Sequence, residues 1–534
     1  MTGGIEGAPE TLREKDTPAM HHVGVRPTPH DLARLRHPAR GRPPAVAALA
    51  AVALALACGP RAAAPSGGGA LPPAVADYAG LRWVPADATY VIATRRGEDA
   101  LALLRGAFDG LGMLADVDAA ELGRASRQEL GFDLLSADDH AAMGVDLQRG
   151  IAVWSQGLGP SLAVPLADPE RMAGELARRR GPGTVIQVGR LRDVEVHTWR
   201  PDREVALHWA IAGDWLLAHL EVVAEGEVDG AWFEGAWAAR GGLAATPDLA
   251  AALDEGRRRL GELPPLVGLV RVPAILAHPR VLEPPACAST LGALGRLFVV
   301  AAADAGAVRA VMVAEVPGGV DGLRALARPA PAGWAKARAG APLVAELGLD
   351  ARAAAAALGP CLEEDLVAGL GLDQVRGGRV FVHAIDTSRL EGRGAATAEL
   401  GDPRMLARAL SEIPGIGFLS KVRAIGPHDI TEVNAPGVPR FAYGQIGPTT
   451  VVAVGVAMDD LLVGGMVAAG DELARLELRP RAWPEATWDE LLAFPVGRAR
   501  TRAALIRRLR AWSRGELTLA LEGRALVVSA RGER

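Results

Sequence analysis

Three equally spaced histidines are the residues of this sequence whose types and spacing most suggest chemistry. His197, His208 and His219 lie in a stretch that alternates apolar and polar residues. Side chains on a strand alternate between its two faces, so such a stretch is typical of antiparallel strands. Two-residue turns at Pro201-Asp202 and Gly213-Asp214 would then bring the three imidazoles onto one face of three consecutive strands.

Imidazole and carboxylate groups together are ligands for zinc, copper or nickel. Glu195 and Glu221 fall on the same predicted face as the histidines. One interpretation of this pattern is therefore a metal site in this hairpin region, which a metal-dependent hydrolase would use. The other interpretation is a solvated sheet face whose opposite side, with Leu207, Trp209 and Ile211, forms core.

The rest of the chain lacks the short motifs that carry known chemistry. It contains no glycine-rich phosphate loop, no His-Glu-x-x-His pair and no Gly-x-Ser-x-Gly. Residues 153–157 come nearest to the last motif but lack its first glycine, so we interpret Ser155 as a serine at the end of a strand. Adjacent carboxylates such as Asp138-Asp139 and Asp459-Asp460 rarely face one another and fit solvated turns or helix starts. No catalytic residue and no cofactor are predicted.

Short alternating segments bounded by Gly, Pro or Asp predict a chain rich in strands. They are residues 150–155, 161–166, 184–199, 204–221, 267–272, 296–316 and 448–456. Helical spacing appears over 98–130, and Asp168-Pro169 begins a further helix. Tight turns between strands favour antiparallel pairing. We therefore expect an α+β fold in which helices pack on one face of a mostly antiparallel sheet.

Four landmarks recur in the same order in the two halves of the chain. Gly144-Val145-Asp146 matches Gly371-Leu372-Asp373, and Asp168-Pro169 matches Asp402-Pro403. A three-strand pattern over 193–223 recurs at 429–457, and a two-strand pattern over 296–316 recurs at 515–533. The order predicts two divergent tandem repeats, at 74–325 and 326–534, with chance similarity of Ala-rich segments as the alternative.

A short apolar run ends in a cysteine near the start of the chain. Residues 45–58 read AVAALAAVALALAC, and Arg34, Arg36, Arg40 and Arg42 precede them. The run is shorter than the roughly 20 residues that span a bilayer. A basic lead, a short apolar segment and a small residue before the cleavage point form a secretion signal. With Cys58 at that point, the segment resembles a bacterial lipoprotein signal.

This resemblance implies that residues 1–57 are a signal peptide and that Cys58 is lipidated. Residues 58–73, rich in Gly, Ser, Pro and Ala, would be a flexible tether. Gly59 after the cysteine implies sorting to the outer membrane. An ordinary signal peptide or a buried Ala-rich helix are the alternatives. Residues 81–96, with their Pro-Ala-Asp turn and strand, also resemble the opening of some uncharacterised exported bacterial proteins, for which no chemistry is implied.

The formal net charge of −5, without a basic stripe, argues against nucleic acid as a partner. Cys287 and Cys361 form a disulfide in an exported chain or remain two buried thiols. We expect a membrane-anchored cell-envelope lipoprotein of non-catalytic binding or scaffold type, whose partner is an envelope protein or a cell-wall component. The metal-dependent hydrolase that uses His197, His208 and His219 is the alternative.

Overall fold

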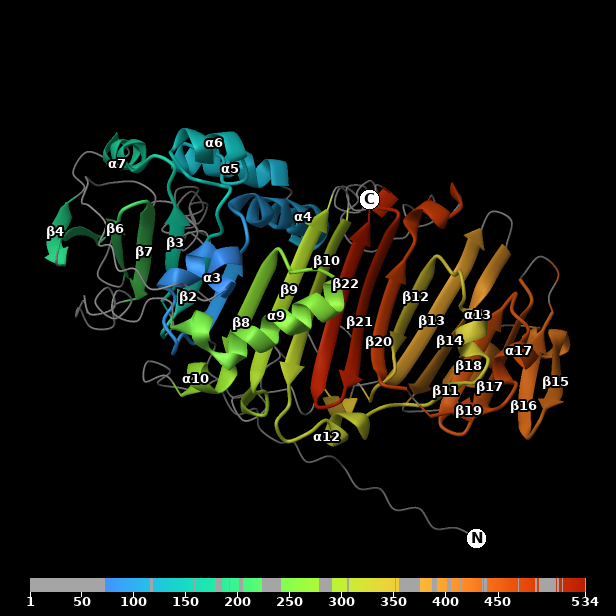
Figure 1. The fold of residues 1–534 in the computed structure, drawn as a ribbon. Helices are drawn as coiled ribbons and strands as arrows, with labels where there is room; N and C mark the ends of the chain where they lie inside the picture. The colour runs from blue at the N-terminus through green and yellow to red at the C-terminus, as the bar shows by residue number, and fades with distance from the viewer. Residues whose placement is uncertain are drawn as a thin grey trace, which may run out of the picture. The chain divides into compact units, whose positions relative to one another are not determined.

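The alternating segments build one extended antiparallel sheet. The structure, a computed structural model, describes residues 73–533 with gaps, of which the longer are 179–184, 223–241, 278–290, 355–374 and 489–505. Twenty of the described strands join in this sheet, and every described pairing is antiparallel (Figure 1). The expected α+β class with a mostly antiparallel sheet is confirmed.

One run of strands leads from the middle of the sheet to the edge strand β4, in the order β10, β9, β8, β1, β2, β3, β7, β6, β5 and β4. Their bounds in chain order are β1 (Tyr90–Thr94), β2 (Ala152–Ser155), β3 (Ser161–Pro165), β4 (Ile186–Leu191), β5 (Val194–Trp199), β6 (Val205–Ile211), β7 (Trp215–Val222), β8 (Leu266–Arg271), β9 (Arg296–Asp304) and β10 (Ala307–Glu315).

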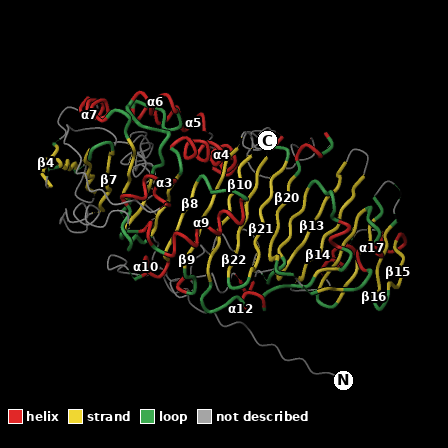
Figure 2. Tube along the Cα trace, viewed as in Figure 1, coloured by secondary structure: helices red, strands yellow, loops and turns green. Residues whose placement is uncertain are grey.

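A second run leads from the middle to the other edge, in the order β22, β21, β20, β12, β13, β14, β18, β17, β16 and β15. Their bounds are β12 (Leu343–Leu347), β13 (Val375–Asp386), β14 (Glu391–Leu400), β15 (Ser420–Ile425), β16 (His428–Val433), β17 (Phe441–Ile446), β18 (Thr449–Val454), β20 (Glu472–Leu478), β21 (Arg514–Glu522) and β22 (Ala525–Glu533). Figure 2 shows the strands of both runs beside one another.

The order of the strands in the sheet, compared with their order along the chain, is the same in both runs. The two runs meet at the pairing of β10 with β22. Val311 faces Ser529 near the centre of that pairing. Registers also correspond between the runs. Ser161 faces His219 in the first run, and Ala395 faces Ala453 in the second. Ala395 follows Ser161 by the same number of residues as Ala453 follows His219. The same difference in residue number relates the hairpin β4–β5, where Ile186 faces Trp199, to the hairpin β15–β16, where Ser420 faces Val433.

The described helices and 3-10 turns lie between the strands of these runs. They are α3 (Pro73–Asp77), η1 (Ala79–Trp83), α4 (Gly97–Ala115), α5 (Ala119–Leu130), α6 (Ala137–Ala142), α7 (Pro169–Arg178), η2 (Leu243–Ala245), α9 (Pro247–Leu260), α10 (Val272–Leu276), α12 (Asp321–Arg324), α13 (Trp334–Ala337), α16 (Met405–Ser411), η4 (Ile416–Leu419), α17 (Met458–Leu462) and η5 (Pro480–Ala482). In the described part of the chain, none of them is long and apolar enough to cross a membrane.

Helices cover both faces of the sheet in the first run, which corrects the expectation of a single covered face. On β7, Leu217 points into a core shared with Leu253 of α9, whereas its neighbour Leu216 points into a core shared with Met172 of α7. Adjacent residues of a strand face opposite sides, so α9 and α7 lie on opposite faces. Strand β7 is therefore buried from both sides, whereas the edge strand β4 is mostly exposed.

The second run has a separate core on one face. Phe381 of β13 packs there with Trp334 of α13 and Leu461 of α17. A smaller cluster around Leu473 and Leu521 lies near the middle strands. Beside the large sheet, β11 (Ala330–Pro331) pairs with β19 (Met466–Val467). The core of the second run thus lies mainly on one side of its sheet.

Candidate functional site

The hairpin of β6 and β7 places two of the three histidines opposite each other. Gly213 has a φ of 61°, the left-handed conformation that a tight two-residue turn requires. With that turn, His208 faces His219, as the sequence predicts. Their rings lie 6.2 Å apart, centroid to centroid, and are stacked at an interplanar angle of 27°.

The third histidine lies on the other face of the sheet, so the predicted three-imidazole site is wrong. His197 faces Trp209 rather than Ala206, and its ring stacks on that indole at 5.4 Å. The observed pairing of Trp199 with Leu207 differs from the pairing that a turn at Pro201-Asp202 would give by an odd number of residues. A register shift by an odd number of residues moves each side chain to the opposite face, so His197 lies on the other face. Among the described residues, no group of three or more His, Cys, Asp or Glu side chains is placed to hold a metal ion.

The buried polar groups of this region hydrogen-bond across neighbouring strands. His208 Nδ1 lies 3.0 Å from Thr198 Oγ1, and His208 Nε2 lies 3.0 Å from Glu221 Oε2. The side chain of His208 is only 3 % exposed, and burial lowers its pKa although Glu221 opposes this shift. Because both ring nitrogens are engaged, the arrangement couples β5, β6 and β7 and leaves no imidazole lone pair for a metal ion.

Three further side chains that the sequence singles out, Ser155, Asp459 and His219, make structural contacts. Ser155 Oγ donates to the carbonyl of Gly159 at 2.8 Å and accepts from the Gly157 amide at 2.9 Å, so this hydroxyl holds the turn after β2. Asp459 pairs with Arg423, with 2.6 Å between Oδ2 and Nη2. His219 Nδ1 lies 2.9 Å from Ser161 Oγ on β3. Asp459 and Arg423 line a separate depression together with Glu432 and Arg440.

A depression lined by aliphatic side chains lies across the second run of strands. Ala345 of β12 faces Val380 of β13 on one side and Leu476 of β20 on the other, and Leu476 faces Leu517 of β21. In the next row, Leu347 faces Gly378 and Ala474. We call this depression the apolar trough; its apolar lining residues are Ala345, Leu347, Gly378, Val380, Ala396, Ala474, Leu476, Leu517, Leu519 and Val528. The polar residues that also line it are Glu346, Arg379, Thr397, Arg475 and Thr518.

Small and large residues alternate in the trough, which gives it depth. Ala345 and Ala474 leave space beside Leu476 and Leu347, and the resulting cavity has a volume of about 710 Å³. Leu476 remains 39 % exposed and Leu517 remains 45 % exposed. The trough thus leaves aliphatic side chains of these strands partly open to solvent.

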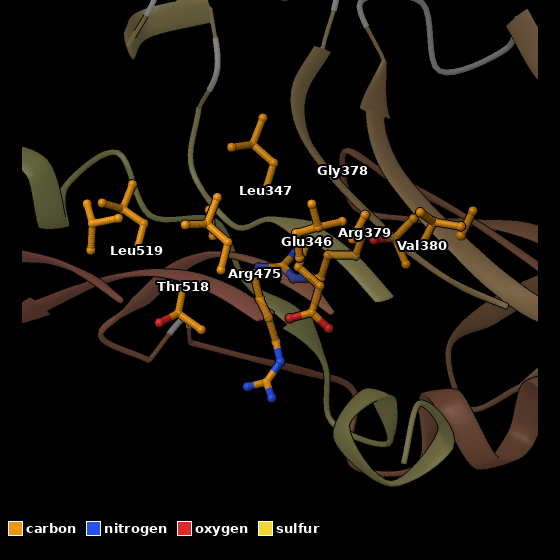
Figure 3. A pocket seen from close by; sticks show the side chains of 15 residues that line it. Glu346, Leu347, Gly378, Arg379, Val380, Arg475, Thr518 and Leu519 are labelled. Atoms are coloured by element: carbon orange, nitrogen blue, oxygen red, sulfur yellow. The ribbon is translucent and has the colours of Figure 1, made fainter. Parts of the chain in front are cut away.

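The charged residues of the same strands point away from the trough. Figure 3 shows Leu347 and Leu519 on one side of the sheet and Arg475 and Thr518 on the other. Arg475 pairs there with Glu477 at 3.0 Å. Burial alone would raise the pKa of Glu477, but hydrogen bonds from Arg479 and Arg475 outweigh it and lower that pKa. These pairs therefore place no charge on the trough face.

A second depression continues the trough toward β18. It has a volume of about 400 Å³ and shares Val380 and Ala396 with the trough. Its other aliphatic side chains include Val382, Val452 and Val454. Gly394 keeps the strands close here, because a Cβ atom at this position would lie 2.4 Å from the carbonyl oxygen of Phe381. The two depressions form one continuous apolar surface.

Several predicted residues lie outside the described residues. These are the signal segment 1–57, the lipidation site Cys58, most of the tether 58–73, and both cysteines of the proposed disulfide, Cys287 and Cys361. The trough, in turn, was not predicted from the sequence. Its only sequence signal is the alternation in residues 343–347, 472–478 and 514–522, which is the pattern of any half-buried strand.

Comparison with known proteins adds little to this description. A scan against protein-family models and a search of curated proteins gave no match. Two solved structures of the Treponema protein TP0453, crystal forms I and IV, resemble 47 % of this chain at TM-scores of 0.24, with 9 % and 8 % identity over 86 % and 85 % of their own chains. Crystal form III resembles 72 % of this chain at a TM-score of 0.21, with 6 % identity over 96 % of its own. Likenesses of this extent indicate neither a shared site nor a shared function.

Proposed function

We propose that this protein is a lipid-anchored, non-catalytic binding protein of the cell envelope, and that it binds its partner at the apolar trough. The open aliphatic surface around Leu476 and Leu517 carries the proposal, because leaving it exposed costs free energy that a bound partner recovers. The engaged ring nitrogens of His208 and the separation of His197 from the other two histidines give the hydrolase alternative no support.

The proposed location rests on the signal segment. Residues 45–58 would direct export, Cys58 would carry the lipid, and residues 58–73 would tether the domain to the outer membrane. Partners would be the membrane itself and an envelope protein or cell-wall component, with no role for nucleic acid. Stable anchoring requires more than one acyl chain, which a bacterial lipoprotein cysteine carries.

We also propose that the domain consists of two divergent tandem copies, 74–325 and 326–534, each an antiparallel sheet with its helices. The matching strand orders support this, as does the register shared by Ser161–His219 and Ala395–Ala453. By the same offset, Ala442 and Ala453 correspond to His208 and His219. The facing pair of His208 and His219 would thus belong to the first copy, and the trough to the second.

Fatty-acid labelling tests the anchored location. The wild-type chain and Cys58→Ser are expressed in parallel, labelled with a radioactive fatty acid and fractionated into membrane and soluble material. We expect label and membrane retention in the wild type and loss of both in Cys58→Ser. A wild-type protein that is unlabelled and soluble would refute the anchor.

A further inference from the structure

We propose that the apolar trough binds the acyl chain of a membrane lipid. This inference rests on the proposed function in one respect, which is that the protein works at a membrane surface. It goes further by naming the chemical class of the ligand and the residues that contact it. The argument uses the chemistry of the lining, the dimensions of the trough and the reach of the tether.

The lining selects a ligand without polar groups. The side chains on the trough face are aliphatic. Five polar residues also line the pocket, and they alternate with the aliphatic ones along the strands, so their side chains point to the other face: Glu346, Arg379, Thr397, Arg475 and Thr518. Arg475 is paired there with Glu477. The guanidinium of Arg379 also has hydrogen-bond partners within the protein, because it donates to the carbonyls of Pro329 and Arg328 at 2.8 and 2.7 Å. A sugar or an extended peptide would place hydroxyl or amide groups against aliphatic carbon without hydrogen-bond partners, at a cost of about 1–3 kcal/mol each.

The dimensions fit a long, thin ligand. The trough and its continuation cross β22, β21, β20, β12, β13, β14 and β18. Neighbouring strands lie about 4.8 Å apart, so the apolar surface extends over about 29 Å. One leaflet of a bilayer is about 15 Å of hydrocarbon, which is the length of one acyl chain. The surface is therefore long enough for a complete acyl chain. Its alternating Leu and Ala side chains are apolar, as are the methylene groups of that acyl chain.

The tether favours lipid over other apolar partners. Residues 58–73, fully extended at about 3.3–3.6 Å per residue, reach roughly 50 Å from Cys58. The first described helix, α3, begins at Pro73. A domain held within that distance of a bilayer meets acyl chains at a high effective concentration. Membrane lipid is thus the apolar ligand that an anchored domain meets most often.

Binding of a fluorescent fatty acid, cis-parinaric acid, tests the inference. The full chain carrying Cys58→Ser is used as the reference, so that no attached lipid competes with the probe. In that background, Leu517→Glu places a charge in the trough and Ala345→Trp fills it. Val422→Glu is the matched control, because Val422, like Leu517, is an exposed aliphatic residue on a strand, at 62 % exposure, but it lies on β15.

We expect saturable binding by the reference protein and by Val422→Glu. Both trough variants should weaken binding about tenfold or more, since a buried leucine contributes about 1.5–3 kcal/mol. Circular dichroism and the thermal midpoint identify any variant that fails to fold, and Ala345→Trp and Leu517→Glu test the same surface independently. Absence of saturable binding, or equal binding by folded trough variants, would overturn the inference.

The outcomes separate this inference from the proposed function. Labelling of wild-type Cys58 together with no probe binding leaves an anchored protein whose trough has a different partner, and it refutes the acyl ligand. Probe binding at the trough without labelling of Cys58 supports the acyl ligand and refutes the anchor.

Discussion

At the scale of residues, the buried ionisable groups join strands rather than perform chemistry. His208 links Thr198 to Glu221, and Glu477 accepts hydrogen bonds from Arg475 and Arg479. A buried polar group is costly unless its partners are present. These groups therefore make the stability of the sheet sensitive to pH and to single substitutions.

We expect stability to fall as the pH drops through the ordinary histidine range. His208 has a lowered pKa in the folded protein, and its ordinary value is 6.5. Below that value the unfolded chain takes up a proton that the folded chain resists, so acidification favours unfolding. Thermal midpoints measured from pH 8 to pH 5 should decrease. His208→Gln should have a flatter profile, and an unchanged profile in this variant would contradict the assignment.

Glu477→Gln should destabilise the protein by about 1.5–3 kcal/mol, because Arg475 and Arg479 would lose a buried charged acceptor. Its pKa is lowered in the folded state from an ordinary 4.5, so its contribution is present above that pH and lost in acid. Glu472→Gln is the control. That carboxylate also pairs with Arg475 but is more exposed, and its loss should cost less than about 1 kcal/mol. Urea denaturation at pH 7 measures both variants.

Residue patterns predicted that His208 faces His219, but they did not predict the face on which His197 lies. The Gly-Asp turn after β6 has a recognisable local signature, so the pairing of His208 with His219 followed from the sequence. The connection before β6 has no such signature. A two-residue turn at Pro201-Asp202 and the observed pairing of Trp199 with Leu207 differ by an odd number of positions, which reverses the face of His197.

At the scale of elements, the β6–β7 hairpin depends on the conformation of its turn. Gly213→Ala should destabilise the protein by about 1 kcal/mol, because Gly213 has a φ of 61°. Gly515→Ala is the matched control, since a Cβ atom there meets nothing within 4 Å. Chemical denaturation compares the two. Equal effects would show that the turn does not constrain the hairpin.

The trough belongs to the elements β12, β20 and β21, and it could not be predicted from their sequences. Each strand alternates in the usual way, so the pattern shows that one face is apolar. Whether a helix covers that face depends on tertiary packing. In the first run, α7 and α9 cover opposite faces, whereas Leu476 and Leu517 in the second run stay exposed. Sequence alternation therefore predicted the sheet but not its open surface.

At the scale of the whole molecule, the pairing of β10 with β22 joins the two runs. Nine residues of each strand take part, and Val313 and Val527 from these strands are buried in the same core. Such a joint couples the halves thermodynamically. We expect one cooperative unfolding transition for the described domain.

Val311→Pro should uncouple the halves, because proline removes a donor from the middle of β10. Differential scanning calorimetry should then resolve two transitions where the wild type has one. A proline at Val188 on the edge strand β4 is the control and should leave a single transition. One transition in Val311→Pro would mean that the coupling lies elsewhere.

The position of β22 also affects how the protein matures. It is the last described strand along the chain, yet it lies between β10 and β21 in the middle of the sheet. During synthesis, β10 therefore keeps an open edge until residues 525–533 arrive. An open edge pairs readily with other chains. The interval before β22 pairs is thus the one in which the unpaired edge of β10 is open to association with other chains.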